Sequence, residues 1–194
     1  MKIKKCVLIA AILFFSLQSF GQTGLKKGMK APEFTAKDND GKTIDMKEQL
    51  RSHKTVVLFF YRGQWCPYCN KYIKQLQDSL QLLTDKGAYV IGVTPETSDN
   101  IKQTVNKTHA SFSIIQDKGY KIMKAYQVNY TVDDATMSKM NKYGVDLEKN
   151  NGNKDNVLPV PATYVIDRSG KIVFVQFDKD FRNRASVSSL LKML

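Results

Sequence analysis

A run of β-branched and aromatic side chains leads almost directly into two cysteines with the spacing C-x-x-C. The run covers residues 55–61 (TVVLFFY), which is typical of a strand that is buried on both faces of a sheet. Cys66 and Cys69 follow within the next eight residues. From residue 70 onward the apolar side chains recur at helical spacing. The sequence therefore predicts a buried strand, a short loop that carries two thiols, and an amphipathic helix that ends near residues 86–87.

The rest of the chain alternates between strand-like and helical stretches. Strands are expected over residues 89–93, 112–115, 163–166 and 171–177, helices over residues 98–108, 118–126, 131–143 and 186–194, and a polar loop over residues 150–156. A turn signal at residues 38–41 lies between two further short strand-like pieces. This order predicts an α/β domain in which a central mixed β-sheet is flanked by helices.

The first 21 residues have the features of a secretory signal peptide. A basic head (residues 1–5) precedes an unbroken apolar run (residues 6–15), and small residues follow at Ser19 and Gly21. A membrane-spanning helix needs about 20 apolar residues, so cleavage is favoured over an uncleaved anchor. We therefore expect residues 1–21 to be removed. The mature domain, residues 22–194, is expected to be exported, periplasmic or secreted, with no stable membrane span.

The composition is that of an ordinary globular protein with a basic excess. Apolar residues make up 42% and charged residues 25% of the chain, which excludes a wholly disordered chain and a disulfide-dense mini-protein. There are 30 Lys and Arg against 18 Asp and Glu, a formal charge of +12. Because the basic residues are scattered rather than clustered, nucleic-acid binding is not expected.

The cysteine count favours redox chemistry over a structural role. With Cys6 in the leader, only Cys66 and Cys69 remain. A disulfide that closes so small a ring contributes only about 2 kcal/mol in the loop-entropy model. Zinc needs four ligands, and His53 and His109 are isolated, so no metal is expected. The remaining interpretation is a dithiol that cycles with its disulfide.

The local pattern also indicates which cysteine is reactive. Pro67 suits the first position of a helix, which places Cys66 at the helix N-terminus, where the helix dipole and free N–H groups stabilise a thiolate. Cys69 lies one turn further on, placed to attack a mixed disulfide or a sulfenic acid on Cys66. Arg62 could add to this effect or be a solvated side chain. Trp65 could shield the sulfur, offer a docking surface or simply pack.

Three stretches of the chain carry a family resemblance. Residues 58–70 (LFFYRGQWCPYCN) resemble the peroxiredoxin-like branch of the alkyl hydroperoxide reductase/thiol-specific antioxidant family. Residues 158–172 (LPVPATYVIDRSGKI) look like its distal motif, and residues 31–34 with 40–41 look like its N-terminal extension. The resemblance implies a thioredoxin-like fold with an N-terminal β-hairpin extension.

The resemblance also implies roles for particular residues. Cys66 would attack the substrate and Cys69 would resolve the product as a Cys66–Cys69 disulfide, without a cofactor. Pro161 would follow a cis peptide bond, which would expose the backbone of Val160 to a bound substrate. The residues expected around the active site are Arg62, Trp65, Pro67, Tyr68, Val160, Pro161 and Thr163.

The chain departs from the family pattern at two positions. Gly63 stands where the family usually has a threonine, and Pro161 stands where an arginine is usual near the distal strand. Those groups normally polarise the peroxide bond. Arg62, Arg182 or Arg184 are the candidates to replace them.

Three functions are compatible with these patterns. The first is a thiol-dependent peroxidase that reduces hydrogen peroxide or organic hydroperoxides and is recycled by a thioredoxin-like dithiol reductant. The second is an exported thioredoxin-like protein thiol–disulfide oxidoreductase that acts on protein disulfides. A binding domain that kept only the fold is the third. The peroxidase is preferred because the resemblance extends over residues 28–184.

Overall fold

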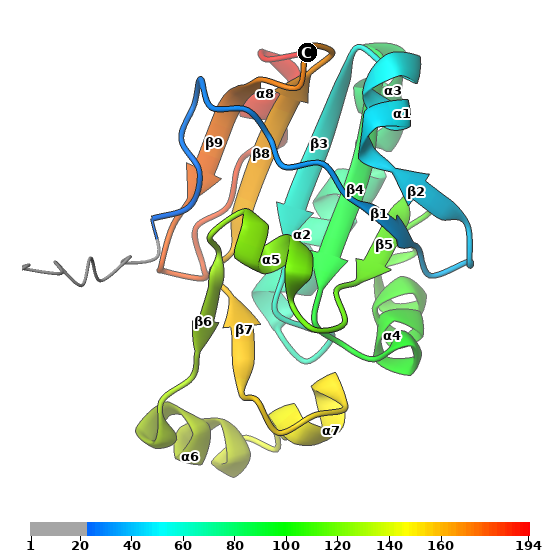
Figure 1. Cartoon of the computed structure of the whole chain (residues 1–194). Helices are drawn as coiled ribbons and strands as arrows, with labels where there is room; N and C mark the ends of the chain where they lie inside the picture. The colour runs from blue at the N-terminus through cyan, green and yellow to red at the C-terminus, as the bar shows by residue number, and fades with distance from the viewer. Residues whose placement is uncertain (1–22) are drawn as a thin grey trace, which may run out of the picture.

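A five-stranded mixed sheet forms the centre of the molecule in the computed structural model, which describes residues 23–194 (Figure 1). The strand order is β5–β4–β3–β8–β9. The strands are β3 (Thr55–Phe60), β4 (Ala88–Thr94), β5 (Ser113–Gln116), β8 (Ala162–Asp167) and β9 (Ile172–Phe177). β3 pairs parallel with β4 and antiparallel with β8, and all six of its residues are buried. The predicted mixed sheet with a doubly buried strand is confirmed.

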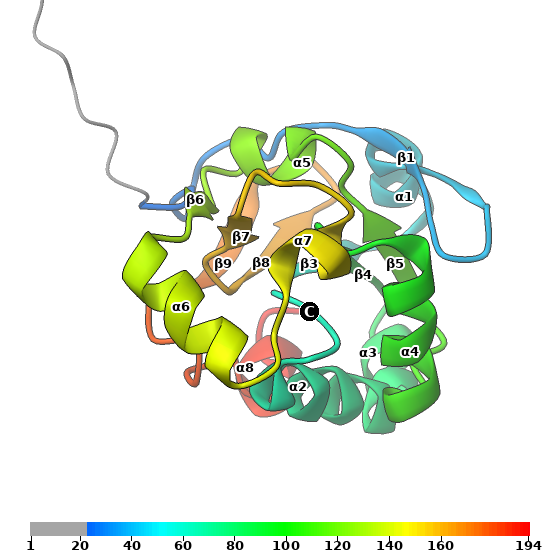
Figure 2. The same cartoon turned by 90° about the horizontal axis from the view of Figure 1, so that it is seen from below.

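Helices cover both faces of this sheet (Figure 2). One apolar core holds buried residues of α2 (Pro67–Asp78), α3 (Leu80–Asp85), α4 (Ser98–Thr108) and α8 (Val187–Leu191). The core on the other face holds buried residues of α1 (Met46–Ser52) and α5 (Lys121–Ala125). Because β3 side chains alternate between these two cores, the loop that follows β3 is held firmly from both sides.

The N-terminal hairpin is present but small. β1 (Thr35–Lys37) pairs antiparallel with β2 (Thr43–Asp45). An isolated bridge between Asp38 and Ile115 attaches it to edge strand β5. The hairpin therefore covers the edge of the sheet that lies furthest from β9.

A separate unit is inserted between α5 and β8, at the lower end of the molecule in Figure 1. Antiparallel strands β6 (Asn129–Thr131) and β7 (Val157–Pro159) form its stem. Between them lie α6 (Asp134–Lys142) and α7 (Leu147–Asn151). Its small core consists of Val132, Leu147 and Leu158, with Trp65 of the thiol loop packed against it. The insertion thus borders the site that the sequence predicts.

Several predicted boundaries need correction. The expected helix over residues 131–143 begins only at Asp134, because the side chain of Asp133 caps it by accepting the N–H of Thr136 at 2.8 Å. The polar loop expected over residues 150–156 begins inside α7. The helix after the cysteines is two helices, α2 and α3, that meet at Ser79. The helix predicted over residues 98–108 matches α4.

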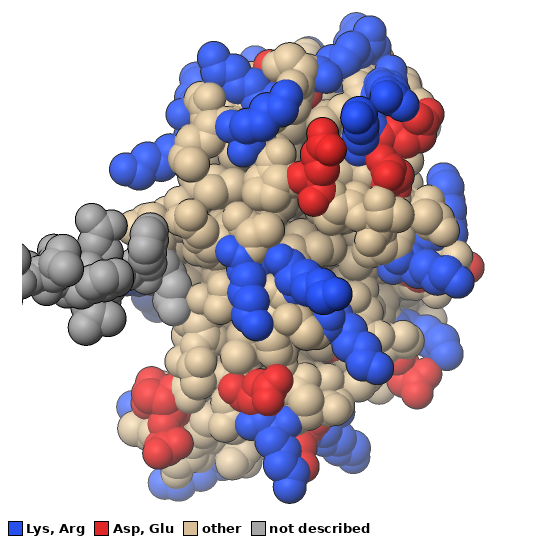
Figure 3. Space-filling view, in the orientation of Figure 1, with Lys and Arg blue, Asp and Glu red and all other residues tan. Residues whose placement is uncertain are grey.

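The predicted signal peptide lies outside the described residues. Between residues 23 and 194 no helix is both long and apolar enough to span a membrane. On the face shown in Figure 3, Lys and Arg side chains are spread over the surface rather than gathered in one stripe.

Candidate active site

Cys66 occupies the N-terminal end of α2, as the sequence predicts. It has extended backbone angles at the N-cap position, and Pro67 is the first helical residue. The Cys66 N–H donates to the carbonyl of Gly63 at 3.0 Å, and the Cys66 carbonyl accepts the N–H of Asn70 at 3.1 Å. This turn places the Cys66 sulfur at the positive end of the helix dipole.

The Cys66 sulfur is stabilised as a thiolate. A hydrogen bond with Cys69 and the nearby guanidinium of Arg62 lower the pKa of Cys66 to about 5, although burial opposes them. Nη2 of Arg62 donates to the Cys66 sulfur at 3.3 Å. The sulfur is therefore an anion at neutral pH, the form in which a cysteine is nucleophilic.

Cys69 is held in the opposite state. Burial raises the pKa of the Cys69 thiol well above its usual range, and the adjoining Cys66 thiolate raises it further. Both cysteines are free thiols in this structure. The pair is thus described in the reduced half of the expected cycle, with one thiolate and one thiol.

Arg62 is enclosed by aromatic rings rather than solvated. Its guanidinium carbon lies 3.8 Å from the ring centroid of Phe181 and 5.1 Å from that of Trp65. Only 9% of Arg62 is exposed. Arg62 is therefore not a solvated side chain but contacts the Cys66 sulfur. Trp65 packs both on Arg62 and against the core of the insertion.

The reactive sulfur is fully buried. Cys66 has 0% exposed surface, although a thiol that attacks an external substrate must be reachable. Phe181 lies over Arg62, and the 42%-exposed ring of Tyr68 meets Phe181 edge-on with centroids 5.6 Å apart. In this conformation Cys66 is closed to solvent, so a substrate reaches it only after part of the cover moves.

A buried carboxylate supports the thiol loop from β4's end. Glu96 accepts the backbone N–H of Gln64 at 2.5 Å and the hydroxyl of Thr104 at 3.4 Å. Burial raises the pKa of Glu96 to about 7. Sequence reasoning missed this residue. The one sequence feature that could have pointed to Glu96 is its position just after β4. Because β4 runs parallel to β3, both strands end at the same edge of the sheet.

The distal motif does not have the expected conformation. In residues 23–194 there is no cis peptide bond, so the expectation that Pro161 follows a cis bond is wrong. Val160 is 4% exposed, and its N–H donates to the carbonyl of Val128 at 2.7 Å. The carbonyl of Pro161 accepts the N–H of Asp178 at 3.4 Å. The trans isomer is the one that X–Pro bonds intrinsically favour. The backbone N–H of Val160, which was expected to face substrate, is used in an internal hydrogen bond instead.

Two other expected residues, Thr163 and Arg182, contact residues other than the two cysteines. The hydroxyl of Thr163 lies 3.0 Å from that of Tyr72 on α2, so it fixes the helix to β8. Arg182 is exposed and forms an ion pair with Asp180 at 2.7 Å. Arg184 lies at the site instead, with Nη2 3.6 Å from the Cys69 sulfur.

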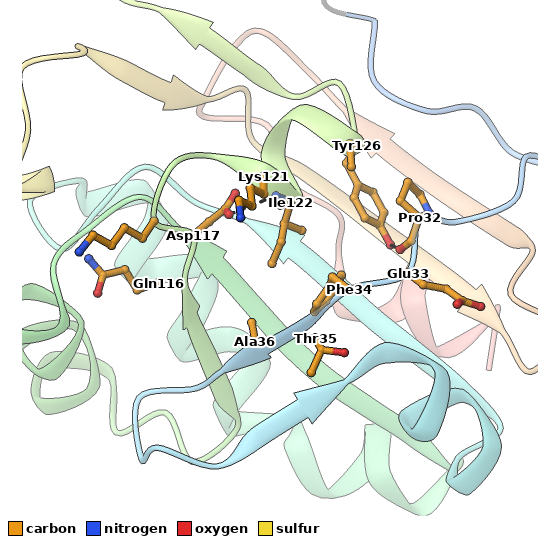
Figure 4. Close-up of a pocket in the computed structure, with 12 residues that line it drawn as sticks. Pro32, Glu33, Phe34, Thr35, Ala36, Gln116, Asp117, Lys121, Ile122 and Tyr126 are labelled. Carbon is orange, nitrogen blue, oxygen red and sulfur yellow. Dashed lines mark hydrogen bonds between the residues drawn. The ribbon is translucent and has the colours of Figure 1, made fainter.

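A cavity of about 380 Å³ opens elsewhere, between the β1 segment and α5 (Figure 4). Its wall includes Phe34, Ile122 and Tyr126, which belong to the core on the face opposite the cysteines. The hydroxyl of Tyr126 donates to the carbonyl of Pro32 at 3.0 Å across this wall. Neither sulfur lines the cavity, so it is not part of the thiol site.

The histidines have structural surroundings. His53 packs on Tyr89 with ring centroids 4.8 Å apart, and His109 ends α4 in a left-handed conformation. Over residues 23–194 no group of three or more His, Cys, Asp or Glu side chains could hold a metal ion.

The fold and the dithiol at the start of α2 define a thioredoxin-fold protein with a redox-type cysteine pair. The model of the AhpC/TSA family matches residues 27–175, and the chain belongs to that family. It is 28% identical over 170 residues to the chloroplastic peroxiredoxin Q of Populus jackii, covering 88% of this chain and 68% of that protein. With the Arabidopsis thaliana peroxiredoxin Q the identity is 27% over 186 residues, covering 96% and 74%.

Solved structures agree on the fold. Peroxidoxin BcpB from Mycobacterium tuberculosis superposes with a TM-score of 0.64 at 18% identity, covering 81% of this chain and 90% of that one. A putative thiol:disulfide interchange protein DsbE from Chlorobium tepidum gives 0.53 at 21% identity, covering 79% and 86%. Because a peroxidoxin and a putative thiol:disulfide interchange protein both share this architecture, the fold alone does not decide the activity.

Proposed function

We propose that this chain is a thiol-dependent peroxidase that reduces hydrogen peroxide or organic hydroperoxides through Cys66 and Cys69. The observation that carries the proposal is the Cys66 thiolate at the start of α2, 3.3 Å from a donor nitrogen of Arg62. Membership of the AhpC/TSA family and the similarity to peroxiredoxin Q proteins support peroxide over protein disulfide as the substrate.

The reaction proceeds in two thiol steps. The Cys66 thiolate attacks one oxygen of the hydroperoxide, the O–O bond breaks, and the alcohol or water leaves after protonation, which makes a Cys66 sulfenic acid. Cys69 then attacks the Cys66 sulfur, and water leaves as the disulfide forms. Arg62 fits the role of stabilising the departing oxygen, because its charge already faces the Cys66 sulfur.

An external dithiol must return the disulfide to thiols. We propose a thioredoxin-type reductant for this step. A yeast mitochondrial 1-Cys peroxiredoxin of related fold, at 16% identity and a TM-score of 0.66, has a thiol resolving mechanism that works via glutathione/thioredoxin systems. We also propose that residues 1–21 direct export and are removed from a domain of residues 22–194. The named relatives are chloroplastic proteins, which supports targeting but not a particular compartment.

Access to Cys66 gives a prediction about its cover. Replacing Phe181 with alanine removes the ring that lies 3.8 Å from the Arg62 guanidinium. Phe181 is only partly buried, and a cation–aromatic contact of this kind contributes about 1 kcal/mol. We therefore expect iodoacetamide to modify Cys66 about five-fold faster in Phe181→Ala. Phe181→Tyr, which keeps an aromatic ring over the Arg62 guanidinium, is the control and should lie close to the wild type. An unchanged or slower rate in the alanine variant would show that this ring does not limit access.

A comparison of substrates tests the function. The chain from residue 22 is reduced and then mixed with hydrogen peroxide, an organic hydroperoxide or a protein disulfide, with a thioredoxin system as electron donor. We expect sustained consumption of at least one hydroperoxide, well above the rate of a free thiol, and slow reaction with the protein disulfide. The reverse order of rates would favour a thiol–disulfide oxidoreductase.

A further inference from the structure

A second arginine reaches the dithiol from the C-terminal part of the chain. Arg184 lies between β9 and α8, next to the buried Ala185. Its Nη2 atom lies 3.6 Å from the sulfur of Cys69, while Nη1 donates to the carbonyl of Asn183 at 2.9 Å. The segment is thus anchored in a way that holds one guanidinium group against the second thiol.

The two sulfurs therefore have one arginine each. Arg62 donates to the Cys66 sulfur at 3.3 Å, and Arg184 to the Cys69 sulfur at 3.6 Å. Of the two sulfurs, only that of Cys66 carries a charge in the reduced protein. Burial raises the pKa of Cys69, the Cys66 thiolate raises it further, and Arg184 acts in the opposite direction. Arg184 is therefore beside a thiol that burial and the neighbouring anion together keep protonated.

The first chemical step removes one of the two influences that keep Cys69 protonated. When the Cys66 thiolate has attacked a hydroperoxide, it has become a neutral sulfenic acid, so its negative charge no longer opposes a Cys69 thiolate. Burial still disfavours a Cys69 thiolate, but the Arg184 charge now acts without a competing negative neighbour. The geometry is in place before the reaction, since Arg184 needs no movement to contact Cys69.

We propose that Arg184 is the catalytic residue of the resolving step: its guanidinium stabilises the Cys69 thiolate that attacks the Cys66 sulfenic acid. The Cys69 sulfur forms a bond to the Cys66 sulfur while the S–O bond of the sulfenic acid breaks. The leaving hydroxide takes up the proton that Cys69 has released, so the products are the disulfide and water. This inference rests on the proposed peroxidase function and assigns the second of its two steps to a second arginine.

The test separates the two steps in the full mature chain. Reduced protein is mixed with one equivalent of hydrogen peroxide and quenched at increasing times with a reagent that traps sulfenic acids, and the trapped and disulfide forms are counted by mass spectrometry. In Arg184→Gln we expect disulfide formation to slow about ten-fold or more, the effect of about one pKa unit on the thiolate fraction. The loss of peroxide should stay within about two-fold, because the largest influences on Cys66 come from Cys69 and Arg62.

Arg182→Gln is the matched control. It removes the same charge from the same segment, but the Arg182 guanidinium is exposed and pairs with Asp180 at 2.7 Å. It should resolve at the wild-type rate. Arg184→Lys keeps a positive charge and should resolve faster than Arg184→Gln, which separates a charge effect from a loss of packing. Thermal unfolding of all three variants checks that the fold is kept, and the lysine variant still decides the question if the glutamine variant is unstable.

The possible outcomes separate the failure of this inference from the failure of the proposed peroxidase function. Wild-type disulfide formation in Arg184→Gln, or equal slowing in both glutamine variants, would overturn the role of Arg184 and leave the peroxidase function intact. If wild-type Cys66 does not form a sulfenic acid with peroxide, the proposed function fails and this inference fails with it.

Discussion

Replacing Cys66 with serine is expected to lower peroxide consumption by at least about 10³-fold, to the background rate. A serine hydroxyl at this position stays protonated near neutral pH, so neither Arg62 nor the start of α2 can make it a comparable nucleophile. Cys69→Ser is the matched variant, because it also removes one sulfur from the same helix. It should consume one equivalent of peroxide and then stop as a sulfenic acid. Stopped-flow measurement of peroxide loss distinguishes the two patterns.

Two results would contradict these roles. Sustained turnover by Cys69→Ser would mean that the resolving thiol comes from elsewhere, such as a small-molecule thiol in the assay. Peroxide loss by Cys66→Ser at the wild-type rate would remove Cys66 from the reaction altogether.

Replacing Gly63 with alanine is expected to destabilise the protein by about 3 kcal/mol or more. Gly63 has a φ of 157°, and an added Cβ would lie 2.4 Å from Nε1 of Trp65 and 2.7 Å from Oε1 of Glu96. Neither neighbour moves freely, because Trp65 packs against the insertion and Glu96 is buried under the loop. The free energy of unfolding, measured by denaturant titration, gives the size of the effect.

Gly41→Ala is the control for the backbone contribution alone. Gly41 has a φ of 81°, and nothing lies within 4 Å of its added Cβ. Its replacement should cost only about 1 kcal/mol. Equal losses of stability in the two variants would show that close packing of the thiol loop adds nothing at Gly63.

Local sequence patterns were sufficient to predict the centre of the fold. The run at residues 55–61 predicts β3, since continuous β-branched and aromatic residues suit a strand covered on both faces. Pro67 predicts the start of α2. The insertion is harder to predict from the sequence, because β6 and β7 are only three residues long and pair with each other across 25 intervening residues. Such pairing leaves little local signal.

The candidate site also has a part that local sequence predicts and a part that depends on distant segments. The place of Cys66 and the contact with Arg62 follow from neighbouring residues on one loop. Glu96 and Arg184 reach the loop from other elements, so their contacts depend on tertiary packing that no spacing reveals. The stacking of Phe181 on Arg62 and the trans bond before Pro161 also depend on how distant segments pack.

The most direct test of the account is the titration of Cys66 in the reduced chain. The thiolate is followed by its ultraviolet absorbance, with Cys66→Ser subtracted, and the rate with hydrogen peroxide is measured over the same pH range. The folded protein lowers the pKa of Cys66 to about 5. Both the absorbance and the rate should therefore stay level between about pH 7 and 8 and fall, as the pH is lowered further, with a midpoint near pH 5. A midpoint near 9, the ordinary value for the thiol, would contradict the claim that this site holds a reactive thiolate.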